Sequence, residues 1–353
     1  MDGQRSESVR GKSLVAWPVV ARPTELGGLG MPDLKLSSIA LQTRWLWLQR
    51  TDESRVWSGL PISVAAEVRA FFEASISVII GNGRRTLFWR DRWVDGLTLS
   101  DLAPTLTAAI PRRTANSLTV ADGFSGRAWV RGIVGGLTVT IIAEYLQVWR
   151  RLEGLQLHEG EEDQVIWKWS ASGRYRTRSA YRALHLGSIH FPTYSLLWKS
   201  WMPLRVKIFV WLAFRRRHWT ADRRRRHGLD AREYCWLCDR EPESCDHLLF
   251  RCPFAREVWQ QVLAKVGRQI PPADDCHGLP DWWLRYRAAW PSALLRGADT
   301  LFGLVCWSIW KQRNACCFRG ERASVASVLL AIRDTAELWI LGEATGLGAV
   351  GLI

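Results

Sequence analysis

The sequence predicts a mainly α-helical protein with small β-hairpins. Apolar residues recur at helical spacing along most of the 353-residue chain. Only two short stretches combine an apolar strand pattern with a glycine turn. The hydrophobic fraction of 48% is enough to bury real cores, and the length allows two or three domains. Most of the 22 tryptophans are therefore expected to be core residues whose indole N–H finds a partner at an edge.

The N-terminal half is expected to be helical after a polar, disordered start at residues 1–13. Asp33 is a candidate N-cap, because its carboxylate can accept hydrogen bonds from the first backbone N–H groups of a helix. A proline in the first turn is tolerated, since its missing N–H has no intrahelical partner there. Helices are predicted over residues 33–50, over 61–75 with Pro61 in the first turn, and over 136–153.

Two hairpins are expected among these helices. In SVIIGNGRRTLFWRDRW, Gly81-Asn82-Gly83 supplies the positive φ angles of a tight turn between two apolar strands. In VIWKWSASGRYRTRSAYRAL, a strand, a turn at Ser172-Gly173, a second short strand and a helix are expected. Residues 96–126 are rich in Pro, Thr, Ser and Gly and are expected to be a connection. The acidic link HEGEED is expected to mark a boundary between regions.

The second half is expected to be helical apart from one cysteine-rich segment. SLLWKSW, PLRVKIFVWLAF and TADRRRRHGL precede that segment. PFAREVWQQVLAKVG follows it, with Pro253 opening the helix and Gly267 closing it. Two more helices are expected up to about residue 340. The chain is thus divided into a start (1–13), a connector (14–155), a cysteine-containing domain (156–270) and a C-terminal helical region (271–353).

The charge of the chain favours a polyanionic partner. The formal net charge is +14, and phosphate contacts made by such a protein release counterions, which favours nucleic acid over a membrane. No run of eighteen apolar residues exists, and the start MDGQRSESVRGK lacks the apolar stretch of a signal peptide. All eight cysteines follow residue 234, unlike a disulfide framework spread along a secreted chain. An intracellular protein of the nucleus or cytoplasm, without a transmembrane segment, is expected.

The segment EYCWLCDREPESCDHLLFRC predicts a metal site. Cys235 and Cys238 stand at C-x2-C, His247 and Cys252 stand at H-x4-C, and eight residues separate the pairs. Three thiolates and one imidazole suit tetrahedral Zn²⁺ and leave no open position for water, so the site is structural. Cys245 is an alternative ligand in place of His247, which is preferred because the apolar HLLF would orient its ring. The helical domain is thus expected to be built around a structural zinc knuckle.

A basic arm precedes this knuckle. Residues 203–228, the arginine-rich arm, carry nine Lys or Arg and one acid, Asp222. Basic and aromatic side chains together suit phosphate contact and base stacking, so the arm is expected to meet the backbone of RNA or DNA. A solvated helix face or a nuclear localisation patch is the alternative. The candidate contacts are Arg215, Arg216, Arg217, Trp219, Arg223, Arg224, Arg225 and Arg226.

No catalytic constellation is evident in the sequence. Asp274-Asp275 follows two prolines in a loop, without the apolar strands that would hold two carboxylates on Mg²⁺. Neither a phosphate-binding G-x-x-x-x-G-K-[ST] loop nor a G-x-G-x-x-G in a strand-to-helix setting occurs. His218 and His227 have no obvious nucleophile beside them. We therefore expect no enzyme activity from this chain.

Several motifs together resemble one family. WKWSASGRYRTRSAY, LWKSWMPLRVKIFVWLAF, CWLCDREPESCDHLLFRCPFAREVW and CWSIWKQRNACCFRG resemble the zinc-binding domain that follows the reverse transcriptase of plant LINE-type (non-LTR) retrotransposons. VAWPVVARPTELGGLGMPDLKLSSIALQTRWLWL and GNGRRTLFWRDRWVDG are similar to the segment that joins polymerase and zinc domain there. The resemblance implies Zn²⁺ on Cys235, Cys238, His247 and Cys252. It also implies a nucleic-acid role accessory to target-primed reverse transcription.

The function expected from the sequence is therefore non-catalytic nucleic-acid binding by a retroelement-derived zinc module. The polymerase of the family, with its metal-binding aspartates, is absent from this sequence, so association with a retroelement polymerase is an expected partnership. Two other interpretations stay open. The zinc site can shape a surface that binds a protein, or the chain can be a degenerate retroelement fragment without function.

Overall fold

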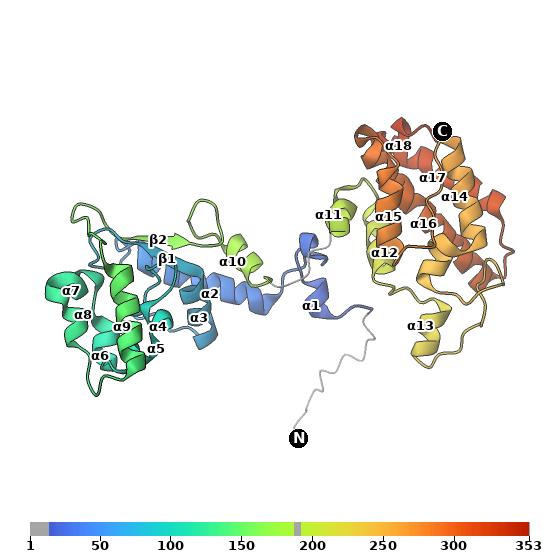
Figure 1. Cartoon of the computed structure of the whole chain (residues 1–353). Coiled ribbons are helices and arrows are strands. Elements are labelled where there is room, and N and C mark those ends of the chain that lie inside the picture. Colours follow the sequence, from blue (N-terminus) through green and yellow to red (C-terminus); the bar gives the residue numbers. More distant parts are fainter. Residues whose placement is uncertain (1–13, 187–191, 353) are drawn as a thin grey trace, which may run out of the picture. The chain divides into compact units, whose positions relative to one another are not determined.

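The computed structural model of the protein describes residues 14–186 and 192–352, and the expected disordered start lies outside the described residues. Helices dominate, and the described residues contain one two-stranded antiparallel sheet, so the predicted mainly α-helical fold class is confirmed (Figure 1). The chain divides into two compact units. Unit 1 combines Met1–Met31 with Ser188–Ile353, and unit 2 is Pro32–Gly187. The sequence regions 14–155, 156–270 and 271–353 do not coincide with these units.

Side-chain contacts hold the N-terminal segment to unit 1. The indole N–H of Trp211 donates to the Gly27 carbonyl over 2.8 Å, and the guanidinium of Arg215 donates to the same carbonyl. Gly27 has φ +84°, in the left-handed region that glycine adopts without strain. The segment around Gly27 therefore packs on helices about 185 residues later in the chain, which no local sequence pattern indicates.

Unit 2 begins with a helix whose start was predicted correctly. The Asp33 carboxylate accepts hydrogen bonds from the N–H groups of Lys35 and Leu36, at 2.9 and 3.1 Å. The elements of this unit are α2 (Leu34–Thr51), α3 (Ala66–Ser75), β1 (Ile76–Ile79), α4 (Leu99–Leu102), α5 (Pro104–Ala108), α6 (Arg112–Ser117), α7 (Val120–Phe124), η2 (Ser125–Arg127), α8 (Ala128–Arg131), α9 (Val139–Leu152), β2 (Gln164–Trp167) and α10 (Thr177–Ala183).

Two helical predictions in unit 2 need correction. Helix α3 begins at Ala66 and not near Pro61. The Gln49 amide donates to the carbonyls of Ser58 and Leu60, at 3.2 and 2.7 Å, and so holds the preceding segment outside the helix. Residues 96–126, expected to be a connection, form the short helices α4 to α7. They enclose a second core, with Leu99, Leu106 and Val120 fully buried.

The predicted hairpin around Gly81-Asn82-Gly83 is wrong. Strand β1 pairs instead with β2, in a register from Ile76 opposite Trp167 to Ile79 opposite Gln164. Asp163 explains the difference. Its carboxylate accepts from the N–H groups of Gly81, Gly83 and Arg85 at 2.8–3.1 Å, and from the Thr86 hydroxyl at 2.7 Å. The loop therefore wraps around one acid from a distant segment. The chain after it returns to β1 at one hydrogen bond, from the Val78 N–H to the Arg92 carbonyl at 2.8 Å, but forms no second strand there.

The second predicted hairpin, after Trp167, does not form either, and a tight turn takes its place. The Trp167 N–H donates to the Gly173 carbonyl at 2.7 Å, and Gly173 has φ +66°, as a tight turn requires. The chain then enters α10 without a second strand. The turn at Ser172-Gly173 was recognised correctly, whereas Gly81-Asn82-Gly83 forms no tight turn and only Gly83 has a positive φ, of +71°. The first strands of the two expected hairpins pair with each other in one sheet.

Unit 1 is a helical bundle that contains the cysteine-rich segment. Two helices were expected after Gly267, whereas α15, α16 and α17 occupy this region. The elements are α1 (Trp17–Val20), η1 (Thr24–Leu26), α11 (Pro192–Lys199), α12 (Leu204–Phe214), α13 (Ala221–Arg226), η3 (His247–Arg251), α14 (Pro253–Lys265), α15 (Leu279–Ala288), η4 (Ser292–Leu294), α16 (Leu295–Arg319), α17 (Val325–Leu341) and α18 (Thr345–Ala349).

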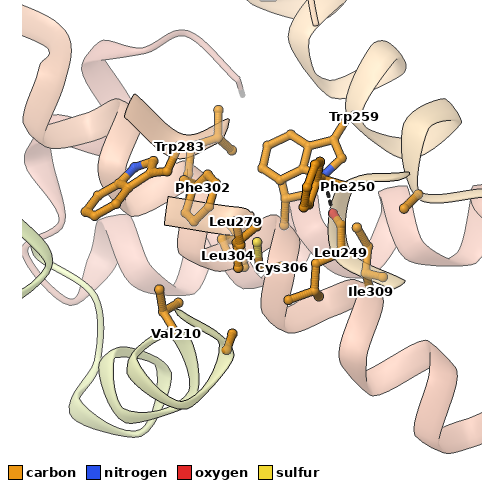
Figure 2. Close-up of a cluster of buried hydrophobic side chains, with 14 of the residues drawn as sticks. Val210, Leu249, Phe250, Trp259, Leu279, Trp283, Phe302, Leu304, Cys306 and Ile309 are labelled. Atoms are coloured by element: carbon orange, nitrogen blue, oxygen red, sulfur yellow. Dashed lines mark hydrogen bonds between the residues drawn. The ribbon is translucent and has the colours of Figure 1, made fainter. Parts of the chain in front are cut away.

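The core of unit 1 is centred on the long helix α16. Phe302 of α16 stacks on Trp283 of α15, with ring centroids 5.4 Å apart. Figure 2 shows Leu249 and Phe250 of the cysteine-rich segment in this core, where the Trp259 indole donates to the Leu249 carbonyl at 2.9 Å. The cysteine-rich segment is thus anchored in the main core of the unit. None of the helices in the described part of the chain is long and apolar enough to cross a bilayer.

Candidate metal centre

The first pair of cysteines lies on a tight knuckle. The Asp239 N–H donates to the Cys235 carbonyl at 2.9 Å, and the Leu237 N–H points at the Cys235 sulfur at 3.4 Å. The Cys235 N–H donates to the Glu241 carbonyl at 2.8 Å, which closes the loop. Asp239 has φ +55°, a conformation that a short polar side chain tolerates. This backbone turns both thiols to one side and directs N–H groups at sulfur, which favours thiolates.

The second pair lies on either side of a buried turn. Residues His247–Arg251 form one π-helical turn, and the Cys252 N–H donates to the His247 carbonyl at 2.7 Å. Leu248, Leu249 and Phe250 between the two ligand residues are at most 1% exposed. Because these side chains fill the core, the turn cannot rotate, and His247 and Cys252 face the same side. Pro253 then opens α14.

All four predicted ligand residues come together. One ligand atom from each of Cys235, Cys238, His247 and Cys252 lies within 4.8 Å of the other three. The Cys238 sulfur and His247 Nε2 are 3.4 Å apart. A tetrahedral ion with bonds of about 2.3 Å to sulfur and about 2.0 Å to nitrogen separates these two atoms by about 3.5 Å. The donor set and its spacing therefore fit Zn²⁺.

A carboxylate that the sequence analysis missed orients the histidine. Glu241 places Oε2 3.2 Å from Nδ1 of His247, opposite the ring nitrogen that faces the sulfurs. A carboxylate on the far nitrogen of a metal-binding histidine fixes its tautomer and raises its basicity as a ligand. Burial lowers the pKa of His247, but the thiols of Cys235 and Cys238 outweigh burial and raise the pKa to about 9. The His247 ring thus lies between the Glu241 carboxylate on one side and the cysteine sulfurs on the other.

The buried thiols share their protons unequally. The pKa of Cys235 falls to about 4, because Cys252 donates a hydrogen bond to its sulfur and His247 adds another, against the effect of burial. The pKa of Cys252 is raised, since its thiol is the donor in that bond and is itself buried. Because a cation binds the thiolate form, the lowered pKa of Cys235 favours metal binding at this group.

Cys245, the alternative ligand, faces away from this group. Its sulfur lies 3.6 Å from the Ala213 carbonyl of α12, and the side chain is 3% exposed. Burial raises the pKa of its thiol, so the neutral form is favoured. Among the described residues, the group of potential ligands contains His247 and not Cys245.

The arginine-rich arm is connected to the cysteine-rich segment through Glu243. The Glu243 carboxylate accepts from the Ala221 N–H at 3.0 Å, and its carbonyl accepts from the Asp222 N–H at 3.1 Å. Both donors belong to the first turn of α13, where N–H groups lack intrahelical partners. Glu243 therefore caps the arginine helix from within the segment between the two ligand pairs.

Two of the predicted phosphate contacts are engaged inside the unit. Arg223 is 5% exposed, lies 4.7 Å from the Trp219 ring centroid, and donates to the Arg217 carbonyl. Arg215 is partly buried, 4.9 Å from the Trp211 ring centroid, and bonds Gly27. The structure therefore removes Arg223 from the predicted phosphate contacts, because its guanidinium is covered. Arg215 holds the N-terminal segment.

Most of the other arginines of the arm are exposed. Arg216 pairs with Asp246 at 2.7 Å, and Arg226 pairs with Asp222 at 2.7 Å. Arg224 and Arg225 donate to the carbonyls of the loop 230–233, at 2.8–3.3 Å. Arg217 is exposed. Trp219 is partly buried, and its ring centroid lies 5.2 Å from that of His227. Of the predicted phosphate contacts, Arg216, Arg217, Arg225 and Arg226 are exposed, and they form a basic surface.

Comparison with known proteins agrees with this geometry. Residues 175–259 match a family model described as zinc-binding in reverse transcriptase. A protein of Arabidopsis thaliana described as a "putative ribonuclease H protein" is 30% identical in an alignment 345 positions long, which covers 85% of this chain and 52% of that protein. The chain therefore spans about half the length of this relative. No solved structure matches the chain. Residues 175–259 are therefore similar to the zinc-binding segment of reverse transcriptases, and the four converging ligand residues lie within this matched stretch.

Proposed function

We propose that Cys235, Cys238, His247 and Cys252 hold one structural Zn²⁺, and that the module binds the backbone of RNA or DNA through the exposed arginines of its arm. The convergence of the four ligand atoms within 4.8 Å of one another carries this proposal. The ion supplies cross-linking and charge compensation for the thiolates. The four residues leave no open ligand position, so the site has no catalytic role.

The arm is the proposed contact surface because the zinc segment fixes its position. Glu243, between the ligand pairs, caps α13 with both its carboxylate and its carbonyl. Arg216 pairs with Asp246, directly before the ligand His247. Ordering of the segment by the ion would therefore order the basic surface as well. Phosphate contacts by arginine do not depend on base sequence, so a backbone reader is proposed.

The proposed role is non-catalytic and accessory to a retroelement polymerase. Among the described residues, the cysteine and histidine group is the one cluster suited to a metal ion, and Asp274 and Asp275 lie exposed in a loop outside it. The name ribonuclease H belongs to the Arabidopsis relative, of which this chain covers about half.

Filter-binding titrations across salt concentrations test the proposal on the full chain. Arg217→Ser with Arg226→Ser removes two exposed charges of the arm, and Arg322→Ser with Arg333→Ser removes two exposed charges elsewhere in unit 1. The slope of log affinity against log salt should fall by about 0.9 per lost phosphate contact on duplex DNA and by about 0.7 on single strands. Equal slopes for both double variants would argue for a zinc-stabilised protein-interaction module instead.

A further inference from the structure

We propose a second nucleic-acid subsite, in unit 2, formed by Trp169 and the arginines Arg176, Arg178 and Arg182. It takes one nucleotide of a single strand, with the base on the indole ring and the phosphate between the guanidinium groups. The inference rests on the proposed nucleic-acid binding and extends it to a surface that the arginine-rich arm does not include. The remaining lining residues of this pocket are Ser170, Ser179, Ala183 and Leu186.

The first observation is the pocket itself. It has a volume of about 380 Å³, within the range of small-molecule sites, and lies between the turn after β2 and helix α10. Its lining contains three arginines and no acidic residue. The whole stretch 164–186 contains five Lys or Arg and no Asp or Glu. An anion is therefore the ligand that this concentration of charge favours.

The second observation is the state of the arginines. Arg176 and Arg178 of the pocket are exposed, as is Arg174 just outside it, and no acidic partner is found for these three within the part of the chain that the structure describes. Exposed arginines elsewhere in unit 2 do form ion pairs, as Arg151 does with Asp95 at 2.8 Å. Neighbouring like charges repel one another, so a bound phosphate would relieve repulsion and be held by planar, bidentate donors.

The third observation is that the loop is held rigidly. The Trp167 indole donates to the Ser179 hydroxyl at 2.9 Å, and that hydroxyl donates to the Arg176 carbonyl at 2.7 Å. The Tyr175 hydroxyl donates to the Ala40 carbonyl of α2, and its ring stacks on Trp47. Residues 175, 177 and 179 are thus partly buried, whereas Arg174, Arg176 and Arg178 are exposed. Because these contacts already fix the backbone of the loop, little conformational entropy is lost when a ligand binds.

Trp169 indicates a single strand rather than a duplex. The side chain is 39% exposed at the pocket, whereas Trp167, two residues earlier, is fully buried. An exposed indole can stack on an unpaired base, and such stacking tolerates any base. In a duplex the base faces are covered by their neighbours, so the ring would gain nothing. Three arginines and one aromatic ring around one pocket fit a nucleotide of a single strand.

Fluorescence anisotropy with labelled oligo(dT) and oligo(U), and with a duplex of equal length, tests this on the full chain. Trp169→Ala should weaken single-strand binding about tenfold, and Trp169→Phe should restore most of it, because base stacking is worth about 1–3 kcal/mol. Duplex binding should stay unchanged. Arg176→Ser with Arg178→Ser should lower the salt slope, whereas the matched pair Arg112→Ser with Arg113→Ser on α6 should not. Circular dichroism and zinc content verify that each variant is folded.

The outcomes separate this inference from the proposed function. If Arg217→Ser with Arg226→Ser weakens binding but the Trp169 and Arg176–Arg178 variants bind normally, the arm stands and the second subsite is wrong. If the pocket variants alone weaken binding, the second subsite stands and the arm is wrong. If Trp169→Ala weakens duplex and single strand equally, the stacking role is overturned. If the wild-type chain binds no oligonucleotide at low salt, both proposals fail.

Discussion

Glu243 and Arg313 form a buried ion pair that joins the cysteine-rich segment to the long helix α16. Nε of Arg313 lies 3.1 and 3.2 Å from the two carboxylate oxygens, and Nη2 lies 2.6 Å from Oε1. The two side chains are 0% and 3% exposed. The same carboxylate caps α13 through the Ala221 N–H. One acid thus connects three parts of unit 1, namely the zinc segment, the arginine helix and the central helix.

Glu243→Gln should therefore destabilise the protein strongly. The variant leaves the Arg313 charge buried without a counter-charge, which costs about 3–5 kcal/mol. Arg313→Met should be similarly harmful, and the double variant should cost less than the sum of the two. Urea unfolding monitored by circular dichroism measures this. Glu321→Gln, which breaks the exposed pair with Arg319, should change stability by less than about 1 kcal/mol.

Loss of a metal ligand should remove the zinc, and loss of Cys245 should not. Cys238→Ser and Cys252→Ser each delete one ligand of the proposed site, and metal analysis of the purified chain should find much less than one zinc per molecule. Cys245 points at the Ala213 carbonyl, so Cys245→Ser should retain one zinc. Full zinc in both ligand variants would contradict the assignment. Chelation of the zinc should also unfold the segment, because its binding free energy is folding free energy.

Glu241→Gln should weaken zinc binding while the four ligands stay in place. The carboxylate lies against His247 Nδ1, and replacement of such an outer partner lowers metal affinity by about 10- to 100-fold. Competition with a chromophoric chelator measures the change. Glu257→Gln, on the exposed face of α14, is the matched control and should leave the affinity unchanged. An unaltered affinity in Glu241→Gln would mean that the carboxylate does not orient the ring.

The ligand set could be predicted from sequence because its chemistry is local. Cys235 and Cys238 are three residues apart, and the spacing alone brings their sulfurs together. The roles of Glu241 and Glu243 could not be predicted, since both are acids in the same loop. The side chain of Glu241 is 59% exposed beside the imidazole, and that of Glu243 is fully buried against α16, 70 residues away. Only the packing of distant helices distinguishes them.

The same limit explains the errors in the arm and the sheet. Arg223 and Arg225 are two residues apart in one arginine run, so the turn of a helix sends one into the core and the other to solvent. A count of charges in the sequence cannot tell the buried Arg223 from the exposed Arg225. Strand β1 was given a neighbouring partner because glycine turns are local signals, whereas β2 lies more than 80 residues later. Asp163, whose carboxylate organises the loop, carries no local mark of that role.

His218 should make the protein acid-sensitive. Burial lowers its pKa to about 4, and the ring packs between Phe209 and Trp310 with Nε2 2.8 Å from the Phe209 carbonyl. The unfolded chain binds a proton near pH 6.5 and the folded protein only near pH 4, so this contribution is complete above pH 6.5 and is lost as the pH falls towards 4. By pH 4.5 the loss should reach about 2 kcal/mol.

Urea unfolding at pH 7 and pH 4.5 gives the loss of unfolding free energy for wild type and for His218→Asn. The difference between the two losses is the contribution of His218, because acid release of zinc affects both proteins equally. The variant cannot titrate at this position, so its stability should fall less with acid than that of the wild type. His277→Gln is the control, because His277 is exposed in the same unit and should leave the pH dependence unchanged. Parallel pH profiles for wild type and His218→Asn would show that the imidazole binds its proton at the same pH in the folded and unfolded chain, and that burial does not govern its charge.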